Sequence, residues 1–260
     1  MKLTPLKISE YKREGRKIAM LTVYDYAGAR ILDEAGIDVL LVGDSLGNVV
    51  QGKTTTLPVT LDEIIYHAEI VSRAVRRALV VVDLPFPYCQ LGAAEAIRAA
   101  ARIFKETEAD AVKVEGGSNR APTIAALVEA GIPVMGHCGL LPQSVHQSGG
   151  FFIQRRREQL LKDVKAIEEA GAFAILLECV TTEITKEATE ILRTPTIGIG
   201  AGGDCDGQVL VFHDIFGYTP PEKTRPPKHV RQYADLKSII SEAAKNYIND
   251  IQNSTYINNN

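Results

Sequence analysis

The chain has 260 residues, of which 45% are hydrophobic and 23% are charged, which is enough for one globular domain with a substantial core. Its 29 basic and 32 acidic residues give a formal net charge of −3, so no basic excess exists for binding nucleic acid. The sequence shows no signal-peptide pattern and no apolar run of membrane-spanning length, so we expect a soluble, cytoplasmic protein without a membrane partner.

Short apolar runs rich in Val, Ile and Leu recur along the chain and predict strands that are buried on both faces, as in a parallel sheet. There are eight such runs, at residues 18–23, 39–42, 79–82, 111–114, 133–136, 174–177, 196–199 and 209–212. Segments of helical period lie between most of them, at residues 61–75, 93–109, 123–130, 158–170 and 183–192. The gap between the last two strands is too short for a full helix.

Alternating strands and helices favour either a (β/α)8 barrel or an open, doubly wound sheet. Eight strands in about 250 residues favour the barrel. We therefore predict a single-domain (β/α)8 TIM barrel over residues 1–260. Beyond the last strand, the Pro-rich residues 219–227 predict a rigid excursion and residues 235–251 a closing helix. The polar residues 253–260 are expected to form a disordered tail.

Polar side chains stand at the end of five consecutive predicted strands, from the second to the sixth. These residues are Asp44 with Ser45, Asp83, Lys113 with Glu115, His137, and Glu178. In a parallel barrel the carboxyl ends of all strands meet at one rim, where active sites lie. Polar residues with unrelated structural roles would rarely fall at the same end of five consecutive strands. The sequence therefore predicts an active site at this rim.

The residue types at this rim favour metal-assisted chemistry on an oxyacid. Asp44, Asp83 and Glu115 would offer hard oxygen ligands to a magnesium ion, with other positions left for water and substrate. The four cysteines are scattered singly, without a C-x-x-C pair, which excludes a thiolate zinc site of that pattern. Lys113 would supply a cation for a substrate carboxylate or an enolate oxygen, and Glu178 is free to act as a base.

Each of these residues also has a purely structural interpretation. Asp44 and Asp83 could be helix caps or turn residues. Lys113 and Glu115 could form a salt bridge inside the barrel, and His137 taken alone is a hydrogen-bonded packing residue more often than a ligand. The conjunction of all five sites, and no single residue, favours the functional interpretation.

Several motifs, in chain order from about residue 22 to residue 227, closely resemble the ketopantoate hydroxymethyltransferase family (3-methyl-2-oxobutanoate hydroxymethyltransferase). The motifs are Gly43-Asp44-Ser45-Leu46-Gly47, Val82-Asp83-Leu84-Pro85, Lys113-Val114-Glu115-Gly116-Gly117, Leu141-Pro142-Gln143-Ser144-Val145, Leu177-Glu178-Cys179-Val180 and Gly198-Ile199-Gly200-Ala201-Gly202.

The resemblance implies a (β/α)8 barrel that assembles as a homodecamer. It further implies transfer of a hydroxymethyl group from 5,10-methylenetetrahydrofolate to 3-methyl-2-oxobutanoate through a magnesium-stabilised enolate. The product would be ketopantoate (2-dehydropantoate), for pantothenate and coenzyme A biosynthesis. By the same resemblance, Asp44, Asp83 and Glu115 match the magnesium positions, some of them through water. Asp44, Ser45, Asp83 and Lys113 match the ketoacid-binding positions, and Glu178 matches the general base.

One departure from the family pattern concerns the loop after Gln154, which is shortened so that residues 155–157, all arginines, lead directly into a helix. This departure affects the expected shape of the folate entrance. Two other functions stay open on the sequence. One is another magnesium-dependent ketoacid or phosphoenolpyruvate-type barrel, a lyase or mutase. The other is a catalytically idle barrel that serves as a structural or binding subunit.

Overall fold

The computed structural model describes residues 1–150, 152–220 and 227–256. The chain divides into two compact units, Met1–Leu210 and Val211–Asn260. All eight strands belong to the first unit, and the regular secondary structure in the described part of the second is helical.

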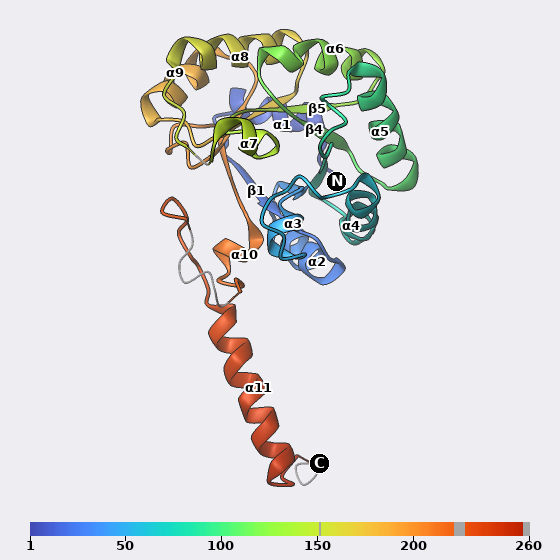
Figure 1. The fold of residues 1–260 in the computed structure, drawn as a ribbon, viewed down its shortest axis with the longest axis vertical. Coiled ribbons are helices and arrows are strands. Elements are labelled where there is room, and N and C mark those ends of the chain that lie inside the picture. Colours follow the sequence, from blue (N-terminus) through green and yellow to red (C-terminus); the bar gives the residue numbers. More distant parts are fainter. Residues whose placement is uncertain (151, 221–226, 257–260) are drawn as a thin grey trace. The chain divides into compact units, whose positions relative to one another are not determined.

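The first unit is a closed barrel of eight parallel strands in sequence order, which confirms the predicted (β/α)8 fold (Figure 1). The barrel closes because β1 pairs with β8, with Ile18 opposite Gly207. The strands are β1 (Ile18–Thr22), β2 (Val39–Val42), β3 (Leu79–Asp83), β4 (Ala111–Glu115), β5 (Val134–Gly139), β6 (Ala174–Glu178), β7 (Thr196–Ile199) and β8 (Gly207–Leu210).

The last strand begins two residues earlier than the sequence predicts. Gly207 belongs to it because the backbone there passes close to β1: a Cβ at this position would lie 2.6 Å from the carbonyl oxygen of Ile18. Only glycine permits that approach, and its lack of a side chain hides the strand from hydropathy patterns. At the other end, β3, β4 and β6 extend one residue further than predicted and so include Asp83, Glu115 and Glu178 as their final residues.

Helices surround the strands, as Figure 1 shows for α5, α6, α8 and α9. The longer ones are α2 (Tyr26–Ala35), α4 (Leu61–Ala74), α5 (Ala93–Glu106), α6 (Ala121–Glu129), α8 (Arg157–Glu169) and α9 (Thr182–Ile191). Short helical turns lie in the loops at α3 (Leu46–Val49), η1 (Ser118–Arg120), η2 (Pro142–Ser144) and α7 (Val145–Ser148). Residues 200–206, between β7 and β8, contain no helix, as the short gap predicts.

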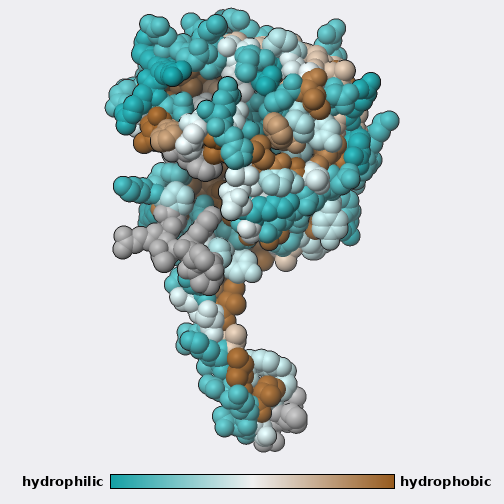
Figure 2. All heavy atoms as spheres, viewed as in Figure 1, coloured by the Kyte–Doolittle hydropathy of each residue, from teal (hydrophilic) through white to brown (hydrophobic). Residues whose placement is uncertain are grey.

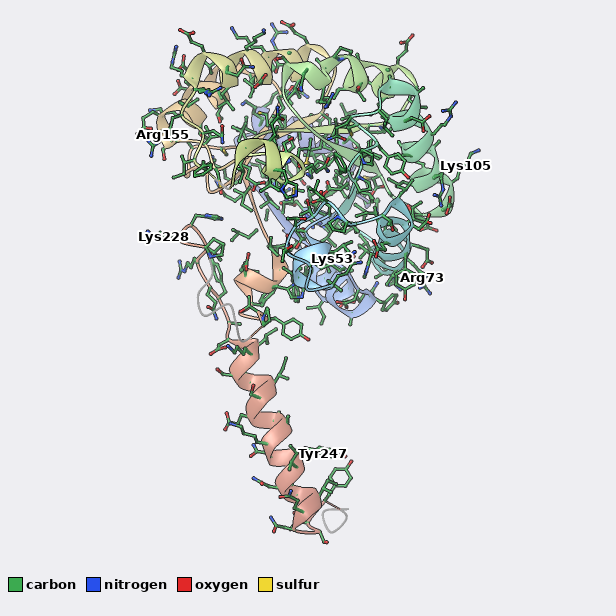
Figure 3. The ribbon with its side chains drawn as sticks, viewed as in Figure 1. Lys53, Arg73, Lys105, Arg155, Lys228 and Tyr247 are labelled. Atoms are coloured by element: carbon green, nitrogen blue, oxygen red, sulfur yellow. The ribbon has the colours of Figure 1, made fainter. Side chains whose placement is uncertain are left out.

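The outer helices follow ordinary sequence rules. In α4, Thr60 and Glu63 form a capping box, and the side chains of Ile64, Ala68 and Val71 are buried. Charged side chains such as Arg73 on α4 and Lys105 on α5 point away from the barrel (Figure 3). Hydrophilic residues accordingly predominate over these helices on the face that Figure 2 shows.

The sequence analysis did not predict the first helix, α1 (Pro5–Arg13). It begins with Thr4 as N-cap and Pro5 at the first helical position, which is a recognisable start signal. Ile8 and Tyr11 are buried and pack in the same core cluster as inward-facing strand residues such as Met20 and Val209. The helix therefore completes the hydrophobic core of the barrel.

The second unit contains α10 (Phe212–Ile215) and α11 (Leu236–Gln252). The predicted helix at residues 235–251 is thus present, capped by the Asp235 side chain, and none of its residues is buried. Most of the Pro-rich segment, residues 221–226, and the last part of the predicted tail, residues 257–260, lie outside the described residues. Among the described residues, no helix has the length and apolar character needed to cross a membrane.

Candidate active site

The predicted site residues from β2 to β5 come together in the interior of one barrel rim. Asp44, Asp83, Lys113, Glu115 and His137 are each at most 5% exposed. Glu178, at the end of β6, keeps 19% of its side chain exposed. The strand register explains the clustering, because Asp83 is the partner of Lys113 and Glu115 is the partner of His137.

Asp44 and Asp83 are linked through the backbone of the loop after β2. The backbone N–H of Asp44 donates a hydrogen bond to Asp83 Oδ2 over 2.9 Å. Gly43 allows this approach, since a Cβ there would lie 3.1 Å from Asp83 Oδ2 and 3.0 Å from Ser45 Oγ. The Gly-Asp-Ser sequence therefore brings two carboxylates and a hydroxyl into one small volume.

Lys113 is the buried cation of the site. Its Nζ lies 3.0 Å from Asp83 Oδ1, an ion-pair contact without hydrogen-bond geometry, and 3.1 Å from His137 Nδ1. Burial works against the charge on Lys113, but attraction to Asp83, Asp44 and Glu115 outweighs it and raises the pKa of the ammonium above its usual value. Lys113 therefore stays charged.

The carboxylates outnumber this cation, and their ionisation is correspondingly difficult. Burial and the nearby Asp83 raise the pKa of Asp44 to about 7. Burial and the nearby Asp44 raise the pKa of Glu115 well above its ordinary value. The site as it stands therefore carries more buried negative potential than Lys113 neutralises, which favours a further cation.

Gln143 is a site residue to which the sequence analysis gave no role. Its backbone N–H donates to Glu115 Oε1 over 2.8 Å, and its side-chain Nε2 donates to Asp44 Oδ2 over 3.0 Å and to the carbonyl oxygen of Leu84 over 3.1 Å. Gln143 is only 4% exposed, and Gln90 donates to its Oε1. The motif at residues 141–145 was part of the family resemblance, but nothing in one sequence shows which carboxylates a glutamine amide reaches.

Ser45 has a partner that the sequence analysis also missed, namely Tyr24. The two hydroxyls lie 2.8 Å apart, and burial raises the pKa of Tyr24, so the phenol stays protonated. His67 on α4 is half-buried, and its Nδ1 lies 2.6 Å from the carbonyl oxygen of Tyr24. Since a carbonyl can only accept, Nδ1 of His67 carries the proton.

Glu178 approaches the other groups only through His137. Its Oε2 lies 3.3 Å from His137 Nε2, without a hydrogen bond. The following residue, Cys179, has a left-handed backbone with a φ of 50°. The N–H of Cys179 donates to Ile199, and its carbonyl oxygen accepts from the N–H of Gln154. These contacts hold the segment after Glu178 between β7 and the loop that leads to α8.

The loop after Gln154 is short in the structure as well. Gln154 pairs with Val180 in an isolated parallel bridge, and α8 begins at Arg157. Arg155 is exposed and points outward (Figure 3). This segment therefore lies directly beside the end of the strand that carries Glu178.

The donor set suits a hard cation but does not enclose one by itself. Asp83 Oδ1 is buried and has no hydrogen-bond partner. Within the part of the chain that the structure describes, no three or more His, Cys, Asp or Glu side chains form a group that could hold a metal ion. Asp44 and Asp83 nevertheless fit magnesium, because they supply two carboxylates in a site whose negative charge Lys113 alone does not balance.

Comparison with known proteins extends over the whole chain. The sequence profile of the family described as ketopantoate hydroxymethyltransferase matches residues 2–259. The 3-methyl-2-oxobutanoate hydroxymethyltransferase of Rhodopirellula baltica is 51% identical over 255 residues, which cover 98% of this chain and 94% of the relative. The enzyme of the same name from Trichlorobacter lovleyi is 50% identical over 98% of this chain and 96% of its own.

Solved structures with a similar fold are much more distant in sequence. A phosphoenolpyruvate phosphomutase from Streptomyces platensis subsp. rosaceus superposes with a TM-score of 0.62 at 15% identity, covering 95% of this chain and 88% of its own. A phosphonopyruvate hydrolase gives a TM-score of 0.63 at 11% identity, with coverage of 97% and 88%. These similarities concern the barrel fold, whereas the family match and the near-half identity concern the whole sequence. The chain is therefore an enzyme of the ketopantoate hydroxymethyltransferase family.

Proposed function

We propose that this enzyme transfers a hydroxymethyl group from 5,10-methylenetetrahydrofolate to 3-methyl-2-oxobutanoate and so forms ketopantoate. The observation that carries the proposal is the buried Lys113 ammonium among Asp44, Asp83 and Glu115 at the rim where Glu178 stands. This arrangement offers positive charge to a substrate carboxylate and a separate carboxylate for proton transfer. The resemblance further suggests a cytoplasmic homodecamer.

The ketoacid would bind against Asp44, Ser45, Asp83 and Lys113. Lys113 is held in place by Asp83 and His137, so its ammonium needs little reorganisation when a negatively charged oxygen arrives. The Ser45 hydroxyl is oriented by Tyr24 and can complete the pose. Binding in a fixed pose lowers the entropic cost of the later attack on the one-carbon unit.

Magnesium would be held by Asp44 and Asp83, with Glu115 linked to Asp44 through Gln143. When bound, the ion supplies polarisation of the keto oxygen, which acidifies the neighbouring C–H bond. Since the protein side chains do not enclose a metal by themselves, we expect water and ketoacid oxygens to complete the ligand set.

Glu178 would remove the proton from the branched carbon of the ketoacid. It is the carboxylate of the site that combines contact with His137 and partial exposure, so the proton it takes can exchange with solvent. The carbon that loses the proton would then attack the one-carbon unit of the folate after one of its two C–N bonds has opened. Water would replace the remaining nitrogen, which leaves the hydroxymethyl group on the product and releases tetrahydrofolate. The short segment at Gln154–Arg156, beside the end of β6, would border the folate entrance.

The alternative, a magnesium-dependent lyase or mutase, has weaker support. Its representatives among the similar structures share the barrel but only 11–18% of the sequence. An assay that separates the two measures ketopantoate from the ketoacid with and without 5,10-methylenetetrahydrofolate, and with and without EDTA. We expect folate-dependent product that EDTA abolishes. Carbon–carbon cleavage or phosphonate chemistry without folate, and no ketopantoate, would overturn the proposal.

A further inference from the structure

We propose that His137 is a positioning residue for the base: it directs an Nε2–H at the Glu178 carboxylate, in a tautomer that Lys113 imposes. The inference rests on the proposed role of Glu178 as the group that takes the substrate proton. Taken by itself, this histidine would more often be a hydrogen-bonded packing residue than a ligand, and the surroundings of its two ring nitrogens argue against a packing role.

The imidazole lies between two charged groups of opposite sign. It is 2% exposed and lies within β5, opposite Glu115 on β4 and Leu176 on β6. Nδ1 lies 3.1 Å from Lys113 Nζ, and Nε2 lies 3.3 Å from Glu178 Oε2. Glu115 Oε2 is the third charged atom nearby, 3.8 Å from Nδ1.

The chemistry of Lys113 decides which nitrogen carries the proton. An ammonium group has only donors, so the nitrogen that meets it must offer a lone pair. In a neutral imidazole with Nδ1 as acceptor, the proton is on Nε2. That N–H then faces the Glu178 carboxylate, which can only accept when it is ionised. Burial and the charge of Lys113 lower the pKa of His137, in keeping with a neutral ring.

Within the part of the chain that the structure describes, the Nε2–H has no other hydrogen-bond acceptor. Nε2 is fully buried and has no hydrogen-bond partner, although Glu178 Oε2 is within 3.3 Å. A histidine kept only for packing would leave this polar atom unsatisfied at a cost of about 1–3 kcal/mol. Glu178 is the partly exposed member of the pair, so its carboxylate is the group that can turn to accept the bond. A hydrogen bond from His137 would thereby restrict the orientations of the Glu178 carboxylate.

Two substitutions of His137 distinguish the contact of Nδ1 with Lys113 from the contact of Nε2 with Glu178. In His137→Asn the short amide can still accept from Lys113 but does not reach Glu178. In His137→Gln the longer amide places an N–H near the position of Nε2. Cys138→Ala is the matched control, since Cys138 is the buried neighbour on the same strand and points to the other side of the sheet.

The measurement is exchange of the methine proton of 3-methyl-2-oxobutanoate with solvent deuterium, followed by NMR, beside calorimetric binding of the same ketoacid. We expect His137→Asn to bind the ketoacid as the parent does but to exchange about 10²-fold more slowly. His137→Gln should recover most of the exchange, and Cys138→Ala should match the parent in both. Unchanged exchange in His137→Asn, or equal losses in the Asn and Gln variants, would overturn the proposal.

A second readout needs no variant. Nitrogen-15 NMR of the histidine rings in the unmodified protein should show His137 protonated on Nε2 and unprotonated on Nδ1. The opposite tautomer would refute the inference while leaving the proposed function intact. Absence of exchange in the unmodified enzyme with ketoacid and magnesium would instead refute the role of Glu178 and, with it, the proposed function.

Discussion

Asp83 and Lys113 are register partners on neighbouring strands, and their side chains form an ion pair of 3.0 Å inside the barrel rim, where both are nearly inaccessible to water. Removing two charges from water costs several kcal/mol for each, and their attraction offsets this only in part. A pair in this position contributes little to stability in itself. The pair instead holds the Lys113 ammonium in place where a negatively charged substrate would bind.

Breaking this pair from one side should be more harmful than removing it altogether. Lys113→Met leaves the Asp83 carboxylate buried and unpaired, and we expect a loss of about 3–5 kcal/mol in the free energy of unfolding. The double variant Asp83→Asn/Lys113→Met should regain a large part of that loss. Urea unfolding of the single and double variants measures the coupling.

Lys105→Met, at an exposed position near the end of α5, is the control and should change stability by no more than about 0.5 kcal/mol. Strictly additive effects of the two site substitutions would contradict the interpretation of Asp83 and Lys113 as a coupled pair.

The raised pKa of Asp44 makes the metal-free protein sensitive to pH. Because the pKa is about 7 in the folded protein, the native state keeps a proton that the unfolded chain releases above about pH 4. The stability that this proton provides is therefore complete at low pH and is lost as the pH rises through 7.

Asp44→Asn removes that dependence. In EDTA, we expect the variant to gain stability relative to the parent as the pH rises from 4 to 8, by roughly 4 kcal/mol at most on the scale of about 1.4 kcal/mol per pKa unit. Thermal unfolding at several pH values measures it, with the exposed Asp204→Asn as control. A difference between variant and parent that stays constant with pH would count against the raised pKa.

Glu178→Gln tests the assignment of the base. The amide keeps the size of the side chain but cannot accept the proton, so methine exchange should fall by about 10²–10⁴-fold. Ketoacid binding, which depends on Lys113 and the Asp side chains, should persist. Deuterium exchange and calorimetry measure the two effects. The exposed Glu183→Gln, on the next helix, should leave both unchanged, and normal exchange in Glu178→Gln would assign the base elsewhere.

Gln143→Leu tests whether one amide organises two carboxylates. The change retains the volume but removes the side-chain donor to Asp44 and leaves only the backbone donor to Glu115. We expect magnesium affinity, measured calorimetrically in the presence of ketoacid, to weaken about 10–100-fold. The exposed Gln159→Ala should have no such effect. Undiminished magnesium binding in Gln143→Leu would show that the amide does not position the carboxylates.

The sequence alone determined the barrel and predicted the rim at which its polar side chains gather. Eight apolar runs with helices between them leave few topologies, and Asp83 and Glu115 directly follow two of these runs, which places them at strand ends. Hydropathy and capping signals in the sequence were less informative where close backbone packing determined the element boundaries. Gly207 joined the last strand through its close approach to Ile18, and the packing of α1 into the core became evident only in the structure.

The contacts that tune the site were decided by the tertiary structure. Gln143 and Asp44 are 99 positions apart, and no rule of spacing connects them. His137 likewise lies between Lys113 and Glu178 because three neighbouring strands pack side by side. The order of these strands in the chain does not show which atoms donate and which accept. Hydropathy and periodicity specify which face of an element is buried. Which polar atoms then meet is set by the packing of elements far apart in the chain, and one sequence does not record that packing.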